Sequence, residues 1–178
     1  MKNLLLHVCC APCANSALKT LNNEFNISFY WHNPNIFNFE EYSNRKNAAI
    51  NFAKENGFDF FEDETFVYDY EKWKAESHEV CLNCYEIRLN KLKAFACQKG
   101  FDYFSTSLLS SPYQKHDLII EICKKLEKES SSKFLYRDFR KFFYEGKNAL
   151  KAKGYYIQKY CACNKSYKER FAKKLDEN

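Results

Sequence analysis

The stretch NLLLHVCCAPC, residues 3–13, joins a nearly continuous apolar run to three cysteines within five positions. Such an apolar run is typical of a strand that is buried on both faces of a parallel sheet. Pro12 cannot extend this strand, and the residues that follow it suit a helix. We therefore predict a first strand at residues 3–9, with Cys9 and Cys10 at its carboxyl end.

Outward from this stretch, strand-like and helix-like segments alternate over the first two-thirds of the chain. The predicted strands cover residues 27–31, 58–61 and 101–109, and the predicted helices cover residues 14–21, 40–56, 81–99 and 117–127. Residues 65–80 are less regular. Helical crossovers connect parallel strands, so we expect one α/β domain over residues 1–178, a mostly parallel sheet flanked by helices with a helical C-terminal part.

The length and the cysteine content narrow the class of protein. A chain of 178 residues suits one domain with a proper core. The apolar run at residues 4–8 is shorter than the roughly 7–15 residues of a signal peptide, and no stretch reaches the roughly 20 residues of a membrane helix. We expect a cytoplasmic protein that does not enter the membrane. In that reducing compartment, grouped thiols more often bind metals or carry out redox chemistry than form disulfides.

Seven of the nine cysteines form three groups, which are Cys9, Cys10 and Cys13; Cys81 and Cys84; and Cys161 and Cys163. The second group opens a predicted helix, where free N–H groups and the helix dipole stabilise thiolates. In an extended chain, both cysteines of the third group would face the same side. The two remaining cysteines, Cys97 and Cys123, lie in helical patterns and are expected to be small buried hydrophobic residues.

The number of grouped thiols leaves several kinds of site open. A single zinc site built from the two C-x-x-C motifs would leave Cys9, Cys161 and Cys163 without a role. An iron–sulfur cluster with four cysteine ligands, beside a second metal, would use all seven thiols. A dithiol oxidoreductase is a third possibility, because the C-x-x-C motif occurs twice.

Positive charge is concentrated at the C-terminal end of the chain. From residue 139 onward there are eleven Lys or Arg and four Asp or Glu, whereas residues 1–138 carry a net charge of −2. A solvated basic helix would explain this surplus. A partner with a phosphate backbone would explain it equally well, because clustered basic residues release counterions from nucleic acids.

Several motifs occur in an order that resembles one known family. They are LLLHVCCAPC, NPNI, EEY with a following arginine, CLNCYEIRL, FDYFSTSLLSSPYQKH, DFR and YYIQKYCACNKS, and together they extend over residues 4–166. This combination resembles the cobalamin-independent epoxyqueuosine reductases, iron–sulfur enzymes of queuosine biosynthesis. The resemblance implies a fold related to the adenine-nucleotide alpha-hydrolase-like (HUP or PP-loop-like) class.

The resemblance also implies two metal sites. A [4Fe–4S] cluster would be bound by Cys9, Cys10, Cys81 and Cys84. A mononuclear metal, iron or zinc, would be bound by Cys13, Cys161 and Cys163. Some family members carry Asp in place of Cys13. Ala162 stands where Gly is usual, a difference that matters if the backbone there is left-handed.

The implied reaction is the two-electron reductive removal of the epoxide oxygen from epoxyqueuosine in a tRNA anticodon loop, with electrons from an unidentified donor. Within the motif segments, the candidate proton donors are Tyr113, Asp138 and Tyr160. Candidate RNA-binding residues are Lys159, Lys165, Lys168 and Arg170. Three further arginines lie in motif segments, Arg45, Arg88 and Arg140, and a surface ion pair on a helix is an equally good expectation for Arg88.

Two alternatives to the reductase stay open. A tRNA thiolase-like enzyme would need a glycine-rich phosphate loop after the first strand, whereas residues 10–14 read CAPCA. A zinc-stabilised RNA-binding module would have no redox activity and would be colourless.

Overall fold

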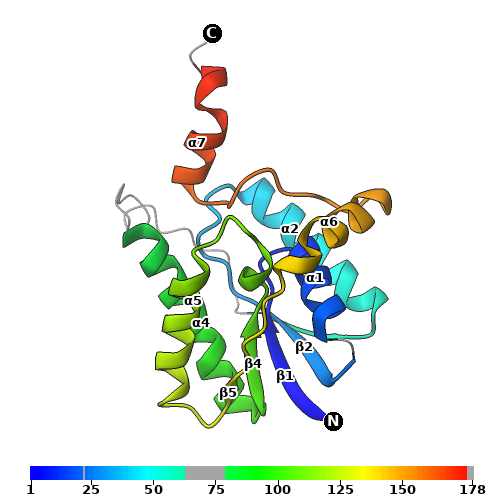
Figure 1. Cartoon of the computed structure of the whole chain (residues 1–178). Helices are drawn as coiled ribbons and strands as arrows, with labels where there is room; N and C mark the ends of the chain where they lie inside the picture. The colour runs from blue at the N-terminus through cyan, green and yellow to red at the C-terminus, as the bar shows by residue number, and fades with distance from the viewer. Residues whose placement is uncertain (22, 63–78, 176–178) are drawn as a thin grey trace.

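The computed structural model describes residues 1–21, 23–62 and 79–175, so most of the irregular stretch at residues 65–80 lies outside the described residues. Its centre is a parallel five-stranded sheet of order β3-β2-β1-β4-β5 (Figure 1). The strands are β1 (Lys2–His7), β2 (Phe25–Trp31), β3 (Asp59–Glu62), β4 (Tyr103–Thr106) and β5 (Lys133–Phe134). The prediction of a parallel α/β sheet is confirmed, and its strand order is that of doubly wound α/β folds.

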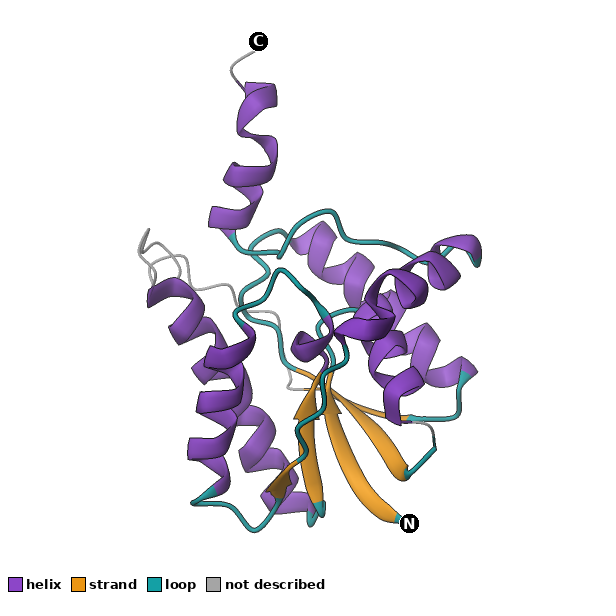
Figure 2. Ribbon diagram, viewed as in Figure 1, coloured by secondary structure: helices purple, strands orange, loops and turns teal. Residues whose placement is uncertain are grey.

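Helices cover both faces of the sheet (Figure 2). On one face lie α1 (Ala11–Leu21), α2 (Phe39–Glu55) and α6 (Phe143–Ala152), and on the other lie α4 (Glu79–Lys99) and α5 (His116–Glu127). Two short 3₁₀ helices, η1 (Ser107–Ser110) and η2 (Arg140–Phe142), follow β4 and precede α6. The C-terminal helix α7 (Asn164–Leu175) projects away from the rest of the molecule (Figure 1). Two helices in the C-terminal part confirm the prediction for that region.

The apolar sequence of β1 follows from its central position. Leu4, Leu5 and Leu6 have no exposed surface, because neighbouring strands lie on either side and helices cover both faces. β1 ends at His7, earlier than predicted, and α1 begins at Ala11, so Cys9 and Cys10 lie in the short turn between them. Pro12 occupies the first turn of α1, where its missing N–H is not needed.

The sheet also departs from the prediction at β4 and β5. β4 ends at Thr106, and the chain continues as η1, where the sequence predicted a strand up to residue 109. A Thr106 side-chain oxygen accepts a hydrogen bond from Leu108 N and starts this turn. β5 was not predicted, because a strand of two residues at the edge of the sheet is too short to produce a recognisable pattern.

The strand order places a crevice at the carboxyl ends of β1 and β4. On one side of β1 the chain adds β2 and β3, and on the other side it adds β4 and β5. Ligands of doubly wound sheets bind at such a reversal point. There the Cys9 backbone N–H donates to Ser107 Oγ over 3.1 Å, which ties the turn after β1 to η1 after β4.

The two isolated cysteines have different environments. Cys123 is fully buried on α5, as predicted. For Cys97 the prediction was wrong, because this residue is half-buried on α4 and its sulfur lies 3.1 Å from Ser130 Oγ rather than in the apolar core. Within the described ranges, no helix combines the length and apolar composition that crossing a membrane requires.

Candidate metal centre

The turn after β1 brings three thiols together. The sulfur atoms of Cys9, Cys10 and Cys13 all lie within 4.8 Å of one another, and those of Cys9 and Cys10 are 3.8 Å apart. Cys10 and Cys13 are buried, and Cys9 is half-buried. Three thiols at this spacing can hold a metal. The structure therefore places Cys13 beside Cys9 and Cys10, whereas the family resemblance assigns Cys13 to a different metal from these two cysteines.

Two other segments add four thiols to the same region. Cys81 and Cys84 lie in the first turns of α4, as predicted, and Cys84 is buried. Cys161 and Cys163 lie between α6 and α7. The pKa of Tyr85 is raised first by burial and then by the nearby charges of Cys161, Cys81 and Cys84, so these three thiols share one electrostatic environment.

A cavity of about 530 Å³ opens beside these cysteines, and Cys9, Cys13 and Cys161 line it. Two glutamine amides donate to sulfur at this site. Gln158 Nε2 lies 2.8 Å from Cys10 Sγ, and Gln114 Nε2 lies 3.2 Å from Cys161 Sγ. Hydrogen bonds of this kind favour a thiolate. Burial nevertheless raises the pKa of Cys10, and hydrogen bonding with Cys163, followed by burial, raises the pKa of Cys161. Sequence reasoning did not single out either glutamine, although both lie in the quoted motifs close to a cysteine or a candidate proton donor.

Each of two thiol groups contains one cysteine whose pKa is depressed. The pKa of Cys9 is held well below its ordinary value by hydrogen bonding with the Cys10 and Cys13 thiols. The pKa of Cys163 is lowered to about 5, first by the Cys161 thiol and, against the effect of burial, by Ser166. Ser166 contributes through its backbone N–H, 3.4 Å from Cys163 Sγ. The lowered pKa values favour the thiolate at Cys9 and Cys163, and the thiolate is the form that binds metal.

Arg88 does not form the surface ion pair that was one of the two expectations for it, because only 2% of its surface is exposed. Its Nη1 donates to Cys84 Sγ over 3.4 Å, and its Nη2 donates to Asn33 Oδ1 over 2.7 Å. Its Nε is buried without a hydrogen-bond partner. Among the described residues, no carboxylate forms an ion pair with this guanidinium. The motif C-x-x-C-Y-x-x-R therefore places a buried cation one helical turn after Cys84.

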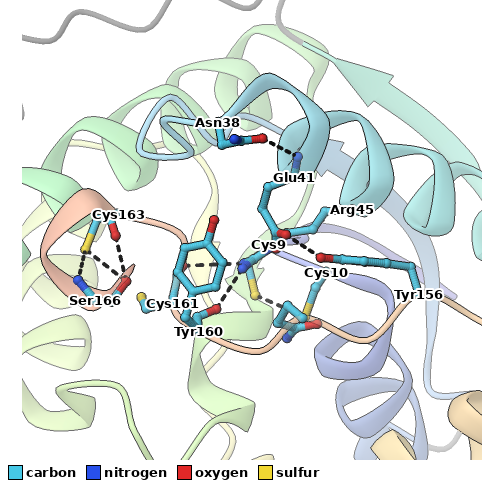
Figure 3. Close-up of polar contacts among 11 residues, drawn as sticks. Cys9, Cys10, Asn38, Glu41, Arg45, Tyr156, Tyr160, Cys161, Cys163 and Ser166 are labelled. Atoms are coloured by element: carbon cyan, nitrogen blue, oxygen red, sulfur yellow. Dashed lines mark hydrogen bonds and ion pairs between the residues drawn. The ribbon is translucent and has the colours of Figure 1, made fainter. Parts of the chain in front are cut away.

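A second buried arginine fixes the segment that carries Cys161. Arg45 Nε pairs with Glu41 Oε1 over 2.5 Å on α2, and both side chains are buried. Arg45 Nη2 donates to the Tyr160 carbonyl oxygen over 2.7 Å, and Nη1 donates to that of Cys161 over 3.4 Å. The Tyr156 hydroxyl donates to the other Glu41 oxygen (Figure 3). The Glu41–Arg45 pair thus anchors the backbone before Cys163 to the body of the domain.

The Cys161–Cys163 segment is not extended, so that part of the prediction was wrong. Ala162 has a φ of 101°, in the left-handed region, and its side chain is buried. This turn, rather than the alternation of an extended chain, allows the Cys161 thiol to donate to Cys163. A non-glycine residue in such a conformation is strained by about 1–3 kcal/mol.

Replacing Ala162 by Gly is expected to raise the free energy of unfolding by about 1 kcal/mol, because strain relief exceeds the entropy that glycine adds to the unfolded chain. For a domain of this size, such a gain raises the melting temperature by about 2–4 °C. Thermal melts of the anaerobic proteins measure it. The matched control is Ala149→Gly at an exposed position of α6, which should lower stability by about 1 kcal/mol. Equal losses from both substitutions would contradict strain at Ala162.

Two of the three candidate proton donors line the cavity, Tyr113 and Tyr160. Burial, followed by the charge of Glu41, raises the pKa of Tyr160 to about 12. Asp138 is not among the cavity-lining residues of the described chain. It forms an exposed ion pair with Arg140 over 2.6 Å, and hydrogen bonding from that arginine lowers the pKa of Asp138 to about 2.

The candidate RNA-binding residues fall into two pairs. Lys159 and Arg170 line the cavity. Lys165 and Lys168 lie on α7, as Arg170 does, but do not belong to the lining. The structure adds Lys147, which lines the cavity from α6. Sequence reasoning missed this lysine, because only the packing of α6 against α1 brings it to the site.

Comparison with known proteins assigns the chain to a family. The family model described as Epoxyqueuosine reductase QueH matches residues 4–169. The protein of that name from Dehalococcoides mccartyi is 37% identical, with 96% of this chain and 95% of that one covered. Its counterpart from Thermotoga maritima is 32% identical, with 96% and 93% covered. The solved U34-tRNA thiolase NcsA from Methanococcus maripaludis, with its [4Fe–4S] cluster, aligns with a TM-score of 0.48 and 13% identity, over 99% of this chain and 73% of that one. From the sequence matches, this chain belongs to the epoxyqueuosine reductase QueH family.

Proposed function

We propose that this chain reduces epoxyqueuosine to queuosine in the anticodon loop of a tRNA. The reaction removes the epoxide oxygen, consumes two electrons and two protons, and leaves an alkene and water. Family membership supports the reaction type. The observation that carries the proposal for this chain is the cavity that Cys9, Cys13 and Cys161 line, beside a cluster of thiols in which two pKa values are depressed.

The donor set fits iron–sulfur chemistry. All the grouped ligands are soft thiols, and the buried charge of Arg88, which no carboxylate among the described residues pairs with, suits a centre of net negative charge. We assign a [4Fe–4S] cluster to Cys9, Cys10, Cys81 and Cys84, and a mononuclear iron or zinc to Cys13, Cys161 and Cys163. When bound, these groups supply single electrons and a Lewis acid that polarises the epoxide oxygen. The electrons come from a separate donor.

We assign proton donation to the two tyrosines of the cavity. Tyr160, with a pKa of about 12, stays protonated at neutral pH and can donate from the cavity wall. The Tyr113 hydroxyl lies at the exposed side of the cavity, since 77% of that residue is accessible. Asp138, with a pKa of about 2, is ionised at neutral pH and carries no proton to donate. We assign it the role of a proton relay outside the cavity.

The mouth of the cavity suits a single-stranded RNA loop. Tyr113 and Tyr144 are largely exposed, with their hydroxyl oxygens 3.3 Å apart. Basic side chains of Lys147, Lys159 and Arg170 line the same cavity. Aromatic rings stack on unpaired bases, and basic residues bind phosphates, which is how proteins recognise single-stranded loops. We propose that the anticodon loop binds here, with Lys165 and Lys168 on α7 contacting phosphates further along the stem.

Replacing Lys159 and Arg170 by Ala is expected to weaken tRNA binding and to make its affinity less dependent on salt. The slope of log K against log salt should fall by about 0.7–0.9 for each phosphate that the protein no longer neutralises. Binding of the anaerobic protein to tRNA at several salt concentrations measures both effects. Lys128→Ala is the matched control, because this lysine follows α5 at the opposite end of the sheet. Equal salt slopes for the double variant and the unchanged protein would remove these two residues from the RNA interface.

The function is tested by anaerobic purification, with iron, zinc and sulfide quantified and an optical spectrum recorded, followed by an assay on tRNA that contains epoxyqueuosine. We expect about four sulfides with four to five irons per chain, absorbance that dithionite bleaches, and formation of queuosine. A colourless protein with bound zinc and no sulfide would instead identify an RNA-binding module without redox activity. An ATP requirement for turnover would favour the thiolase-like alternative.

A further inference from the structure

Among the described residues, no carboxylate forms an ion pair with Arg88. The side chain is 2% exposed, and within the described part of the chain it donates to a sulfur, Cys84 Sγ, and to a neutral amide oxygen, Asn33 Oδ1. A buried cation without an anion strongly destabilises a protein. The other buried arginine of the site, Arg45, satisfies this requirement with Glu41. Arg88 must therefore obtain its counter-charge from something other than a carboxylate among the described residues.

The groups nearest to Arg88 point to that counter-charge. They are thiols: Cys84 Sγ accepts from Nη1 over 3.4 Å, and negative charge on Cys84, Cys9 or Cys161 would favour the charged guanidinium against the effect of burial. The proposed function assigns Cys84 and Cys9 to one [4Fe–4S] cluster. Four thiolates around such a core carry a net negative charge, which increases by one when the cluster accepts an electron.

We infer that Arg88 is a positioning residue that supplies the counter-charge of the cluster thiolates, holds Cys84 through Nη1, and raises the reduction potential of the cluster. The physical reason is that a fixed positive charge in a buried site stabilises the more negative, reduced form more than the oxidised form. Asn33 orients the guanidinium by accepting from Nη2, while its own Nδ2 donates to the Val8 carbonyl oxygen over 3.0 Å. This inference rests on the proposed function.

The first test is Arg88→Met, which keeps most of the side-chain volume and removes the charge. In a redox titration of the anaerobic protein followed by optical and paramagnetic resonance spectra, we expect the reduction equilibrium to fall at least tenfold, which is about 59 mV for one electron. Arg140→Met is the matched control, since Arg140 is exposed and pairs with Asp138 outside the cavity, and it should leave the potential unchanged. An unchanged potential in Arg88→Met, with the cluster intact, would overturn the inference.

A second variant covers the case in which Arg88→Met does not fold or does not retain a cluster. Asn33→Asp places a carboxylate at the atom that now accepts from Arg88 Nη2, and so neutralises the guanidinium without removing it. We expect the potential to fall in the same direction as in Arg88→Met, and no fall would overturn the inference. The titration needs no tRNA. A lowered potential without queuosine formation by the unchanged protein would therefore refute the proposed function alone, whereas full turnover with an unchanged potential would refute only the role of Arg88.

Discussion

Serine in place of Cys10 is expected to remove the visible absorbance and the sulfide of the anaerobically purified protein, and to lower the rate of epoxyqueuosine reduction by at least about 100-fold. Cys10 is 1% exposed and lies within 4.8 Å of two other thiols. A serine hydroxyl is a harder donor that stays protonated at neutral pH, so it cannot replace a thiolate. Its weak interaction with iron would leave an incomplete ligand set.

The matched control for this loss is Cys97→Ser. Cys97 is half-buried on α4 and hydrogen-bonds with Ser130, outside the three groups of cysteines. We expect this variant to keep its iron, sulfide and activity. A Cys10→Ser protein with full iron and sulfide content would show that Cys10 is not a cluster ligand.

Cys13→Ser then tests how the ligands are divided between the two metals. If Cys13 binds the mononuclear metal, this variant retains about four sulfides and loses the additional metal together with activity. Loss of sulfide would instead assign Cys13 to the cluster, in line with its position beside Cys9 and Cys10. Metal and sulfide analysis of the two serine variants therefore decides between the family assignment and the grouping of sulfurs in this structure.

Glu41→Ala is expected to lower the free energy of unfolding by about 3–5 kcal/mol, because it leaves the buried charge of Arg45 without a partner. Glu41 also accepts from Tyr156, and Arg45 holds the carbonyl oxygens of Tyr160 and Cys161. The variant should therefore unfold at lower urea concentration, and its Cys161–Cys163 segment should be held less firmly. Urea unfolding of the anaerobic protein measures the first effect, and the metal-to-sulfide ratio measures the second.

The control for Glu41→Ala is an ion pair on the surface. Glu145 pairs with Lys19 over 2.6 Å, with 60% of the Glu145 side chain exposed. Glu145→Ala should lower stability by less than about 1 kcal/mol. The double variant Glu41→Ala/Arg45→Ala should be more stable than Glu41→Ala, since it no longer contains an unpaired buried charge. A loss below about 1 kcal/mol for Glu41→Ala would mean that water or another group compensates Arg45.

Local patterns in the sequence were sufficient to predict the architecture of the domain. The apolar run of β1, the alternation of strands and helices and the cysteine spacing depend on neighbours along the chain, and they predicted the parallel sheet and the thiols at its carboxyl end. Boundaries were less well predicted. Side-chain hydrogen bonds decide where β4 becomes η1, and sheet pairing alone defines β5.

Thiol chemistry and cysteine spacing are local properties, so they were enough to single out the candidate metal-binding residues, of which the structure groups Cys9, Cys10 and Cys13. The surroundings of those thiols depend on how the chain folds. The tertiary structure buried Arg88 without a carboxylate partner among the described residues, turned Ala162 to a φ of 101°, and brought Lys147 from α6 to the cavity. Burial, backbone conformation and charge at this site depend on contacts between segments that are distant in sequence. Such contacts leave no periodic pattern along the chain, so they could not be predicted from it.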